Sequence, residues 1–338
     1  MRKRLLNIVL FIVSLPLHPQ TGGDNVYEFL NLTHSGLVSS IGGNNVSLFE
    51  NLNMSYHNPA LLNASMNKSL VIDFTNYFAG INYGLVMYGI SSGEKYNFAA
   101  GITYLNYGSF TEADATGNLI GTFTASEYAL NLILSRNIDS LFSVGVNLKP
   151  ILSHLEKYNS FGIAFDIGLA WHSRSRLISA GLTARNTGYQ ITTYAGEQRQ
   201  KLPFEVIAGF SARLAHAPFR FSLTARHLEK FDLTYQYAGT EDEQNNGVLE
   251  NIMRHMIAGV ELIPHKNFYF SAGYNYQRRR ELQTEAKVST SGLSWGFGIR
   301  SSYISIEFGR SAYHLAGSSN HISLIMKPDM IISDYLKK

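Results

Sequence analysis

The feature that most constrains this chain is a long series of segments, from Lys68 to Pro328, in which apolar and polar residues alternate. Alternation with a period of two is typical of β-strands that have one apolar and one polar face. The pattern predicts about fourteen antiparallel strands, an even number as in single-chain bacterial membrane barrels. The predicted strands are residues 68–78, 81–92, 96–110, 121–138, 141–159, 160–174, 176–191, 202–216, 218–233, 251–265, 267–283, 291–302, 303–316 and 319–328.

The lengths of the connections between these segments support the same assignment of strands. Every second connection is short, and several of the others are long and polar, although two are brief. Membrane barrels have short periplasmic turns and longer outer loops in strict alternation. The short connections are residues 91–95, 137–140, 172–175, 216–217, 264–266 and 301–302, and the long ones are residues 110–120, 192–201, 234–250 and 281–290.

Composition agrees with a chain that has one face in lipid. Charged residues make up 16% of the sequence, whereas soluble proteins average about 25%. Twenty Tyr, twenty Phe and 29 Gly favour strands and aromatic girdles over helices. The net charge of +3 is too small and scattered to indicate nucleic-acid binding. The sequence has no Cys, which excludes disulfides, lipoprotein anchoring, thiol catalysis and zinc–thiolate sites.

The N-terminus predicts export. A basic start at Arg2, Lys3 and Arg4 precedes a short apolar run that ends near Leu17. This length suits a cleaved signal peptide, residues 1–20, better than a spanning helix of about 20 apolar residues. No later segment could span a membrane as a helix, so a membrane-embedded form has to be a closed barrel, which leaves no backbone unpaired in hydrocarbon. We therefore predict a multi-pass protein of the outer membrane.

Residues 21–67 differ from the alternating region, because they are rich in Asn, Gly and small residues and cannot form a core of their own. Irregular backbone is tolerated at membrane depth only where protein surrounds it. We therefore predict an all-β fold in which a barrel of residues 68–328 encloses this segment as a plug, or hatch. The candidate hatch residues are Gly42, Gly43, Asn44, Asn45, Asn58, Pro59 and Ala60, with a structural and gating role. Taken alone, Asn58-Pro59 would be an ordinary turn.

The alternation also predicts which charged residues face the lumen. A charge that faced lipid at the middle of the membrane would cost roughly 2–4 kcal/mol for Arg or Lys. These side chains could line a substrate path, but a solvated, salt-bridged interior is the simpler interpretation. The predicted lumen-facing charges are Asp73, Lys149, Asp166, Arg185, Arg213, Arg226, Glu261, Arg300 and Glu307.

The plug segment carries a family resemblance. Residues 42–45 and the Asn58-Pro59-Ala60 motif resemble the hatch of the outer-membrane barrels that transport long-chain fatty acids. Within that superfamily, residues 23–32 (GDNVYEFLNL), 42–47 (GGNNVS) and 57–61 (HNPAL) are similar to the PorV/PorQ group of the type IX secretion system, and most of all to its PorQ branch. The specific matches cover residues 23–62, and the rest agrees in architecture.

This resemblance implies a barrel that is not an enzyme and serves protein secretion. Its partners would be proteins of PorZ, PorU and PorV type and lipopolysaccharide, in a surface complex that processes and anchors secreted cargo. The loops at residues 234–250 and 281–290 are the candidate partner-binding sites. The alternative function is transport of long-chain fatty acids or other small hydrophobic compounds. Phe49, Tyr56, Leu61 and Leu62 could then line a pocket, although they also suit plug packing.

Other motifs carry little chemistry. Ser65–Lys68 and Ser92–Lys95 match the Ser-x-x-Lys pattern of penicillin-recognising enzymes, but the partner motifs of that chemistry are absent. The eleven His residues show no metal-ligand spacing, so we predict neither a metal nor a cofactor.

Two basic segments lie at the ends of predicted strands. Arg278-Arg279-Arg280 could contact lipopolysaccharide phosphates or form an ordinary solvated loop edge. Residues 329–338 are predicted to form a C-terminal periplasmic tail after the last strand.

Overall fold

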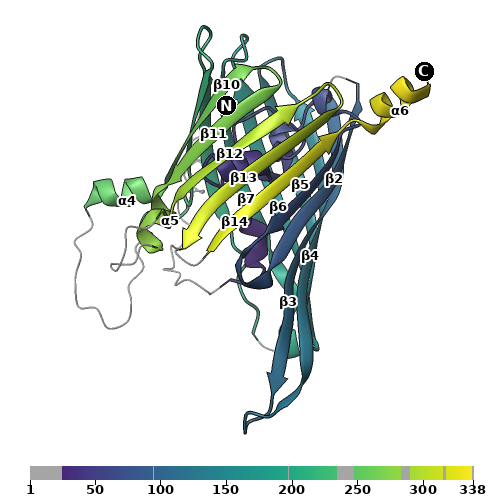
Figure 1. Cartoon of the computed structure of the whole chain (residues 1–338), viewed down its shortest axis with the longest axis vertical. Coiled ribbons are helices and arrows are strands. Elements are labelled where there is room, and N and C mark those ends of the chain that lie inside the picture. The colour runs from purple at the N-terminus through teal and green to yellow at the C-terminus, as the bar shows by residue number, and fades with distance from the viewer. Residues whose placement is uncertain are drawn as a thin grey trace, which may run out of the picture.

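The computed structural model describes residues 25–93, 95–196, 198–233, 247–282, 290–314 and 317–336. Each strand pairs antiparallel with its neighbours in sequence, and the last strand closes on the first, from Leu70 opposite Met326 to Asn76 opposite Asn320 (Figure 1). The predicted all-β, fourteen-stranded closed barrel with an N-terminal segment before it is therefore confirmed. The strands are β1 (Leu70–Asn76), β2 (Asn82–Ser92), β3 (Tyr96–Ala113), β4 (Leu119–Asn137), β5 (Phe142–Leu155), β6 (Tyr158–His172), β7 (Ile178–Thr192), β8 (Glu205–Arg213), β9 (Phe219–Ala225), β10 (Met256–His265), β11 (Phe268–Asn275), β12 (Leu293–Arg300), β13 (Ile304–His314) and β14 (Gly317–Met326).

The outward face of the wall is apolar. Large aliphatic and aromatic side chains are exposed on strand after strand, and they alternate with buried small or polar residues that face inward. Such an exterior is the lipid-facing surface of a membrane barrel. Representative exposed residues are Ile72, Val86, Ile102, Leu132, Val146, Ile167, Leu182, Phe210, Phe221, Phe270, Trp295, Ile306 and Ile322.

Within the described ranges, no helix is long and apolar enough to cross a membrane.

Short turns lie at the rim where β1 begins and β14 ends. We name this the periplasmic rim, because short turns are periplasmic in such barrels, and we name the opposite end the outer rim. The described turns at the periplasmic rim are residues 138–141, 173–177, 214–218, 266–267 and 301–303.

The wall is uneven in height, and one predicted loop is in fact part of the sheet. Residues 110–120 were expected to form a long loop, but β3 and β4 continue to Ala113 and from Leu119 as a hairpin that extends past its neighbours (Figure 1). The rings of Phe110 and Phe123 stack across this hairpin with centroids 5.1 Å apart. Aromatic cross-strand pairs stabilise a ladder, which explains why the strands do not end where the alternation weakens.

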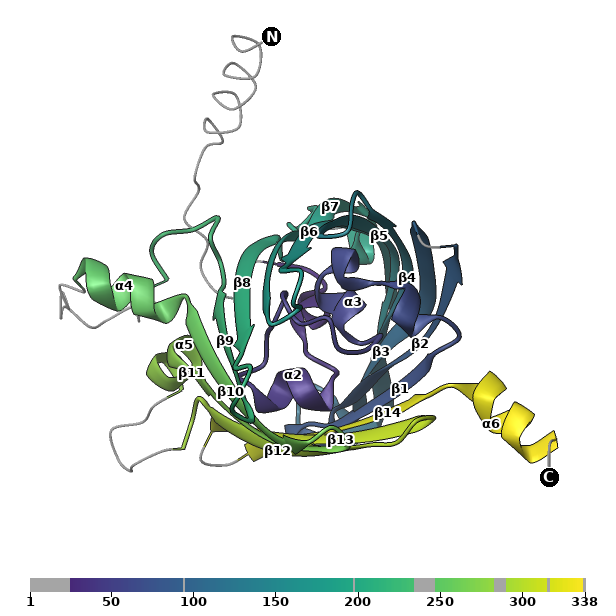
Figure 2. The same cartoon turned by 90° about the horizontal axis from the view of Figure 1, so that it is seen from above.

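Two predicted strand boundaries were wrong because a helix begins one segment and ends the other. The predicted strands 251–265 and 267–283 contain α4 (Val248–Arg254) before β10 and α5 (Tyr276–Glu281) after β11. Asn275 ends β11, since its side-chain oxygen accepts a hydrogen bond from the backbone N–H of Arg278 and caps α5. The predicted C-terminal tail, for which the sequence indicated no secondary structure, forms α6 (Pro328–Leu336), which extends sideways from the wall (Figures 1 and 2).

Residues 25–69 fill the lumen as a plug of short helical turns. Figure 2, a view along the barrel, shows α2 and α3 inside the ring of strands. The plug elements are η1 (Glu28–Asn31), α2 (Gly36–Ser40), α3 (Met54–His57), η2 (Pro59–Leu61) and η3 (Ala64–Met66), and two further single turns, η4 (Phe78–Gly80) and η5 (Tyr194–Gly196), lie in the connections after β1 and β7. The predicted signal peptide, residues 1–20, lies outside the described residues.

The hydrophobic core lies between plug and wall, in three clusters. One cluster, in the outer half, packs Tyr27, Phe29 and Leu30 of the plug against Tyr83 and Leu202. The other two lie around α2 and around α3 and pack plug side chains against the periplasmic half of the wall. Burial of the plug therefore depends on the wall that surrounds it.

Candidate functional site

The Gly42-Gly43 pair forms the turn after α2. Both residues have positive φ, +109° and +94°, a conformation that glycine adopts without steric cost. The backbone N–H of Gly43 donates to the carbonyl oxygen of Val38 at 2.9 Å and closes the helix. The following asparagines are buried, and the side-chain oxygen of Asn45 accepts from the N–H groups of Ser47 and Leu48. These four predicted hatch residues thus turn the chain inside the barrel.

Asn58 joins two parts of the plug to the wall. Its side-chain oxygen accepts from the N–H of Ala60 at 3.0 Å. Its amide group donates to the carbonyl oxygens of Val46 in the plug at 2.9 Å and of Leu169 in β6 at 3.0 Å. Pro59 begins η2, where its missing N–H is not needed. The Asn58-Pro59-Ala60 motif is thus a fully buried contact with the barrel wall.

A belt of glycines on the inner face makes room for the plug. Eight glycines form four cross-strand pairs, and a Cβ atom on any of them would overlap a plug atom or lie within 3 Å of one. At Gly168, for example, that atom would overlap the side-chain oxygen of Asn58. Sequence reasoning missed this belt, although glycine at inward positions of neighbouring strands was a usable signal. The pairs are Gly145–Gly168, Gly181–Gly209, Gly259–Gly273 and Gly296–Gly309.

Serine pairs fasten the plug beside this belt. The hydroxyl groups of Ser40 and Ser271 lie 2.6 Å apart, and those of Ser47 and Ser211 lie at the same distance. Ser39 bonds to Ser311 in β13 at 2.8 Å. Because these side chains are short, the backbones of plug and wall approach closely along much of the barrel circumference.

A first group of charges, the Glu50 cluster, joins the plug to four strands in the periplasmic half. Arg300 lies 2.7 Å from Glu50, and Arg220 forms ion pairs with both Glu50 and Glu261, the latter at 2.6 Å. Glu307 accepts a hydrogen bond from the neighbouring plug residue Asn51. Arg220 was missed by sequence reasoning, although it has the same strand parity as Arg226 and the alternation rule therefore assigns it to the lumen.

A second group, the Tyr56 cluster, lies at mid-height on β5, β6 and β7. Lys149 and Asp166 form a fully buried ion pair at 2.6 Å. The guanidinium group of Arg185 donates to the carbonyl oxygen of Leu30 at 3.0 Å, and the hydroxyl of Tyr56 donates to the same oxygen at 2.9 Å. Both cations also lie over the Tyr56 ring, within 5.5 Å of its centroid. Buried charges require such partners.

The structure places the remaining predicted lumen-facing charges as follows. Asp73 is buried and accepts from Asn53 of the plug at 3.0 Å. Arg226 pairs with Glu205 at 2.6 Å near the outer end of β9. Arg213 is exposed at the periplasmic end of β8, where it lines a cavity. The nine predicted charges therefore contribute to plug contacts, wall ion pairs and one cavity, rather than to a single site.

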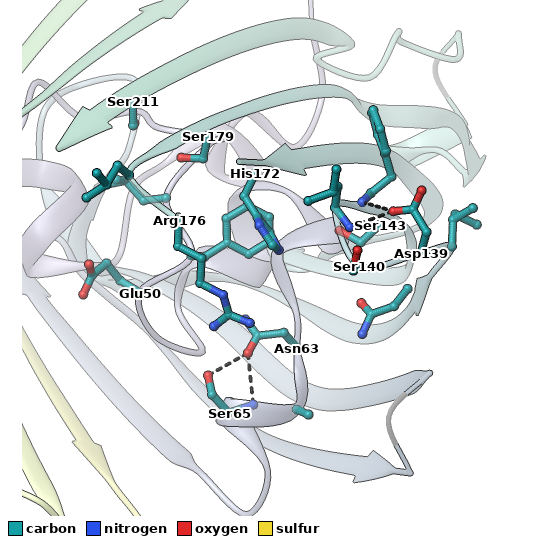
Figure 3. A pocket seen from close by; sticks show the side chains of 18 of the residues that line it. Glu50, Asn63, Ser65, Asp139, Ser140, Ser143, His172, Arg176, Ser179 and Ser211 are labelled. Carbon is teal, nitrogen blue, oxygen red and sulfur yellow. Dashed lines mark hydrogen bonds between the residues drawn. The ribbon is translucent and has the colours of Figure 1, made fainter. Parts of the chain in front are cut away.

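The cavity has a volume of about 590 Å³ and lies between the plug and the periplasmic turns (Figure 3). Phe49 contributes to the apolar part of its lining. The ring of Phe49 lies roughly perpendicular to that of His172, and the ring centroids are 5.2 Å apart. Arg176 and Arg213 also line it and, among the described residues, neither has an acidic partner at ion-pair distance. The cavity thus combines apolar side chains with charged ones of both signs, in which the cations Lys95, Arg176, Arg213 and Arg220 outnumber the carboxylates Glu50 and Asp139.

Of the four residues proposed as pocket-lining, only Phe49 reaches this cavity. Tyr56, Leu61 and Leu62 are fully buried in plug packing, which is the alternative that the sequence left open for them. Ser65 also lines the cavity, but its hydroxyl donates to Asn63 while Lys68 pairs with Asp329. Within the described ranges, no group of three His, Asp or Glu residues could hold a metal ion.

The closed apolar wall, the charged interior and the enclosed N-terminal segment define a plugged transmembrane β-barrel. The chain is similar in fold to the toluene transporter TbuX of Ralstonia pickettii, with a TM-score of 0.53 and 12% identity over 88% of this chain and 98% of that one. It is also similar to the Pseudomonas putida toluene transporter TodX, with a TM-score of 0.52 and 11% identity over 87% and 97% of the two chains. At such identities the similarity establishes the fold alone, and the resemblance of residues 23–62 to a secretion-system group stays a prediction.

No protein-family model and no curated protein sequence matches the chain.

Proposed function

We propose that this protein is an outer-membrane channel that passes small, mainly apolar compounds around a movable plug. The observation that carries the proposal is the cavity of about 590 Å³ directly beneath the plug, in a fold that it shares with two toluene transporters. Ligand sites of this size are typically concave and mostly apolar with a few polar groups. The cavity has this size and, beside Phe49, an apolar part to which Leu48 and Phe142 contribute, while polar side chains line the rest of it.

Passage requires the plug to shift, because it fills the lumen. Hydrogen bonds, ion pairs and apolar packing hold the plug to the wall, and the chain has no Cys that could join the two covalently, so the plug can shift without a covalent bond being broken. The outer half of the plug is covered by the apolar cluster around Tyr27, Phe29 and Leu30. The partly exposed residues that pack against this cluster, Tyr77, Ile81, Tyr107 and Tyr194, are the proposed first contact of an apolar compound that enters from outside, and the cavity is its exit.

The unpaired guanidinium groups extend the proposed substrates to apolar compounds with an acidic group, such as long-chain fatty acids. Arg176 and Arg213 lie on the cavity lining at the periplasmic rim. A carboxylate that leaves the plug would accept hydrogen bonds from these groups, which bind carboxylates in a bidentate geometry. A neutral compound such as toluene gains nothing from them.

The test is uptake of radiolabelled toluene and oleate by cells that lack their own hydrophobic-compound channels. We expect Phe49→Trp, which reduces the cavity, to slow both substrates, and Arg176→Gln with Arg213→Gln to slow oleate alone. Phe210→Trp is the matched control, because Phe210 is exposed on the lipid face. Uptake no faster than in cells without the protein would contradict the proposal.

A second function, a role in a type IX secretion surface complex, is favoured by the β3–β4 hairpin. This hairpin extends past the wall and has exposed apolar side chains, Leu119 and Ile120, close to its tip. Such a projection would suit a surface partner of PorZ, PorU or PorV type. The loops first proposed for that contact, residues 234–250 and 281–290, lie mostly outside the described residues.

Affinity purification from the native outer membrane separates the two functions. If the protein is a secretion component, we expect surface proteins to co-purify with it. We expect these proteins to be lost when residues 111–121 are replaced by a two-residue turn. Normal uptake with no co-purifying protein would remove this second candidate. Recovery of the same partners from the hairpin variant would show that another surface holds them.

A further inference from the structure

Among the described residues, the helix α4 has partners on its polar face and none on its apolar face. Val248, Leu249, Ile252 and Met253 follow the i, i+1, i+4, i+5 spacing that puts side chains on one side of a helix. All four are exposed, Leu249 at 73% and Val248 at 66%. Four of the seven residues of α4 are thus apolar and exposed on one side. Exposure of such an apolar surface to water is unfavourable.

The polar face of α4 is held against α5. Glu250 accepts hydrogen bonds from the hydroxyl of Tyr276 at 2.6 Å and from Arg280 at 2.7 Å, and it also pairs with Arg254 at 3.4 Å. At the end of the helix, a ring nitrogen of His255 lies 2.6 Å from the carbonyl oxygen of Arg226. These bonds fix the rotation of α4 and leave the apolar face directed away from α5.

The position of α4 identifies what covers this face. Figures 1 and 2 both show α4 outside the outline of the barrel, beside the outer ends of β9 to β11. It therefore lies over the surrounding bilayer and not over the lumen. The lipid-facing surface of β9, with Leu223 exposed, continues towards α4 through the exposed Leu228 and Phe231, and the carbonyl of Phe231 contacts His255.

We propose that α4 is an interfacial helix that inserts its apolar face among the acyl chains of the outer leaflet, just below the headgroups. An amphipathic helix at a membrane surface takes this position, and Arg254 of α4 and Arg280 of α5 both pair with Glu250 on the side of α4 opposite to its apolar face. The contact anchors the low side of the wall, where β8 and β9 are only nine and seven residues long. It requires a membrane barrel but is independent of what the barrel transports or binds.

The chain has no Cys, so single-cysteine variants label one site each. The probe is bimane on Leu249→Cys, in full-length protein reconstituted alone in phosphatidylcholine vesicles. We expect blue-shifted emission, loss of most fluorescence with lipid brominated near the headgroup, and protection from aqueous iodide. Val248→Cys, on the same face, repeats the measurement with a second variant.

Two matched sites calibrate the depth. Ile167→Cys, at mid-wall and 59% exposed, should respond most to lipid brominated near the chain ends. Thr116→Cys, at the hairpin tip, should respond to iodide alone. If bimane at residue 249 in these vesicles responds to iodide alone, as is expected at residue 116, the proposal is overturned. Protection from iodide that appears in native membranes but not in the vesicles also overturns it, since a protein partner would then cover the helix.

Discussion

The side-chain amide of Asn58 lies 3.0 Å from the backbone carbonyl oxygen of Leu169, and this hydrogen bond joins the plug to β6. The same amide group also donates to Val46, so one side chain connects two passes of the plug and the wall. Asparagine suits this position because its side chain both donates and accepts. Its oxygen is used as well, by the N–H of Ala60.

Asn58→Asp should loosen the plug while the barrel stays closed. The carboxylate can still accept from Ala60 but cannot donate, which leaves two carbonyl oxygens without this donor. An unsatisfied buried polar group costs about 1–3 kcal/mol. We expect faster hydrogen exchange of residues 44–62 and unchanged exchange in the strands, measured by mass spectrometry. Asn267→Asp, at an exposed periplasmic turn, is the control, and equal plug exchange in the two variants would contradict the role of Asn58.

Gly168→Ala should destabilise the plugged state, because the added methyl group would overlap the side-chain oxygen of Asn58. Overpacking of a close contact typically costs about 1–3 kcal/mol. Gly247→Ala is the matched control, since that glycine has a φ of −55° and open space where the methyl group would lie. Urea unfolding in detergent, followed by gel mobility, should show a lower midpoint for the first variant alone. An unchanged midpoint would mean that the glycine belt does not fix the plug.

Glu50→Gln should leave Arg220 and Arg300 without their plug partner. Breaking a fully buried ion pair costs about 3–5 kcal/mol, and less is expected here because the Glu50 side chain keeps 19% exposure. Planar-bilayer recordings should then show frequent openings that the wild-type protein lacks. Glu112→Gln on the projecting hairpin should behave as wild type. Silent recordings from Glu50→Gln would show that this cluster does not retain the plug.

The hairpin tip should lose order in acid. Hydrogen bonds from the side chains of Thr116 and Asn118, and from backbone N–H groups, hold the pKa of the Asp114 carboxyl well below its usual value. A lowered pKa means that the ordered tip favours the ionised form, so its stabilisation is complete above the usual value of about 3.8 and is lost as pH falls below it.

Amide protection of residues 116–118, corrected for intrinsic exchange, measures this loss. We expect protection to fall below pH 4 in the wild-type protein and to be low and independent of pH in Asp114→Asn. A wild-type tip that keeps full protection throughout the acid range, or the same pH profile in the variant, would contradict this assignment.

The sequence predicts most of the wall because lipid imposes a simple rule on it. An outward residue such as Ile167 has to be apolar, and an inward one such as Asp166 finds its partners only inside. The pairing of Gly145 with Gly168 cannot be predicted from the alternation of residues. It depends on the register between two strands and on where the plug crosses them. The helix α4 was missed for a related reason, since its apolar residues also suit the start of a strand.

Within the plug, the sequence identifies the special backbone positions but not their partners. Gly42 and Gly43 are recognisable because few other residues adopt their φ angles. The function of Tyr56 was not predictable, since its ring and hydroxyl lie between Lys149, Arg185 and the carbonyl of Leu30, which are far apart in sequence. Contacts between plug and wall require the closed barrel before they can be assigned.

The account depends on the N-terminal segment lying inside the barrel, and paired cysteines test this most directly. The hydroxyl oxygens of Ser40 and Ser271 are 2.6 Å apart, as are those of Ser47 and Ser211, close enough for sulfur atoms to bond across 2.05 Å with little movement. In the cysteine-free chain, Ser40→Cys with Ser271→Cys and Ser47→Cys with Ser211→Cys should each form a disulfide in intact membranes. The mismatched pair Ser40→Cys with Ser211→Cys should not. Free thiols in both matched pairs, or equal bonding in the mismatched one, would show that residues 25–69 do not occupy the lumen.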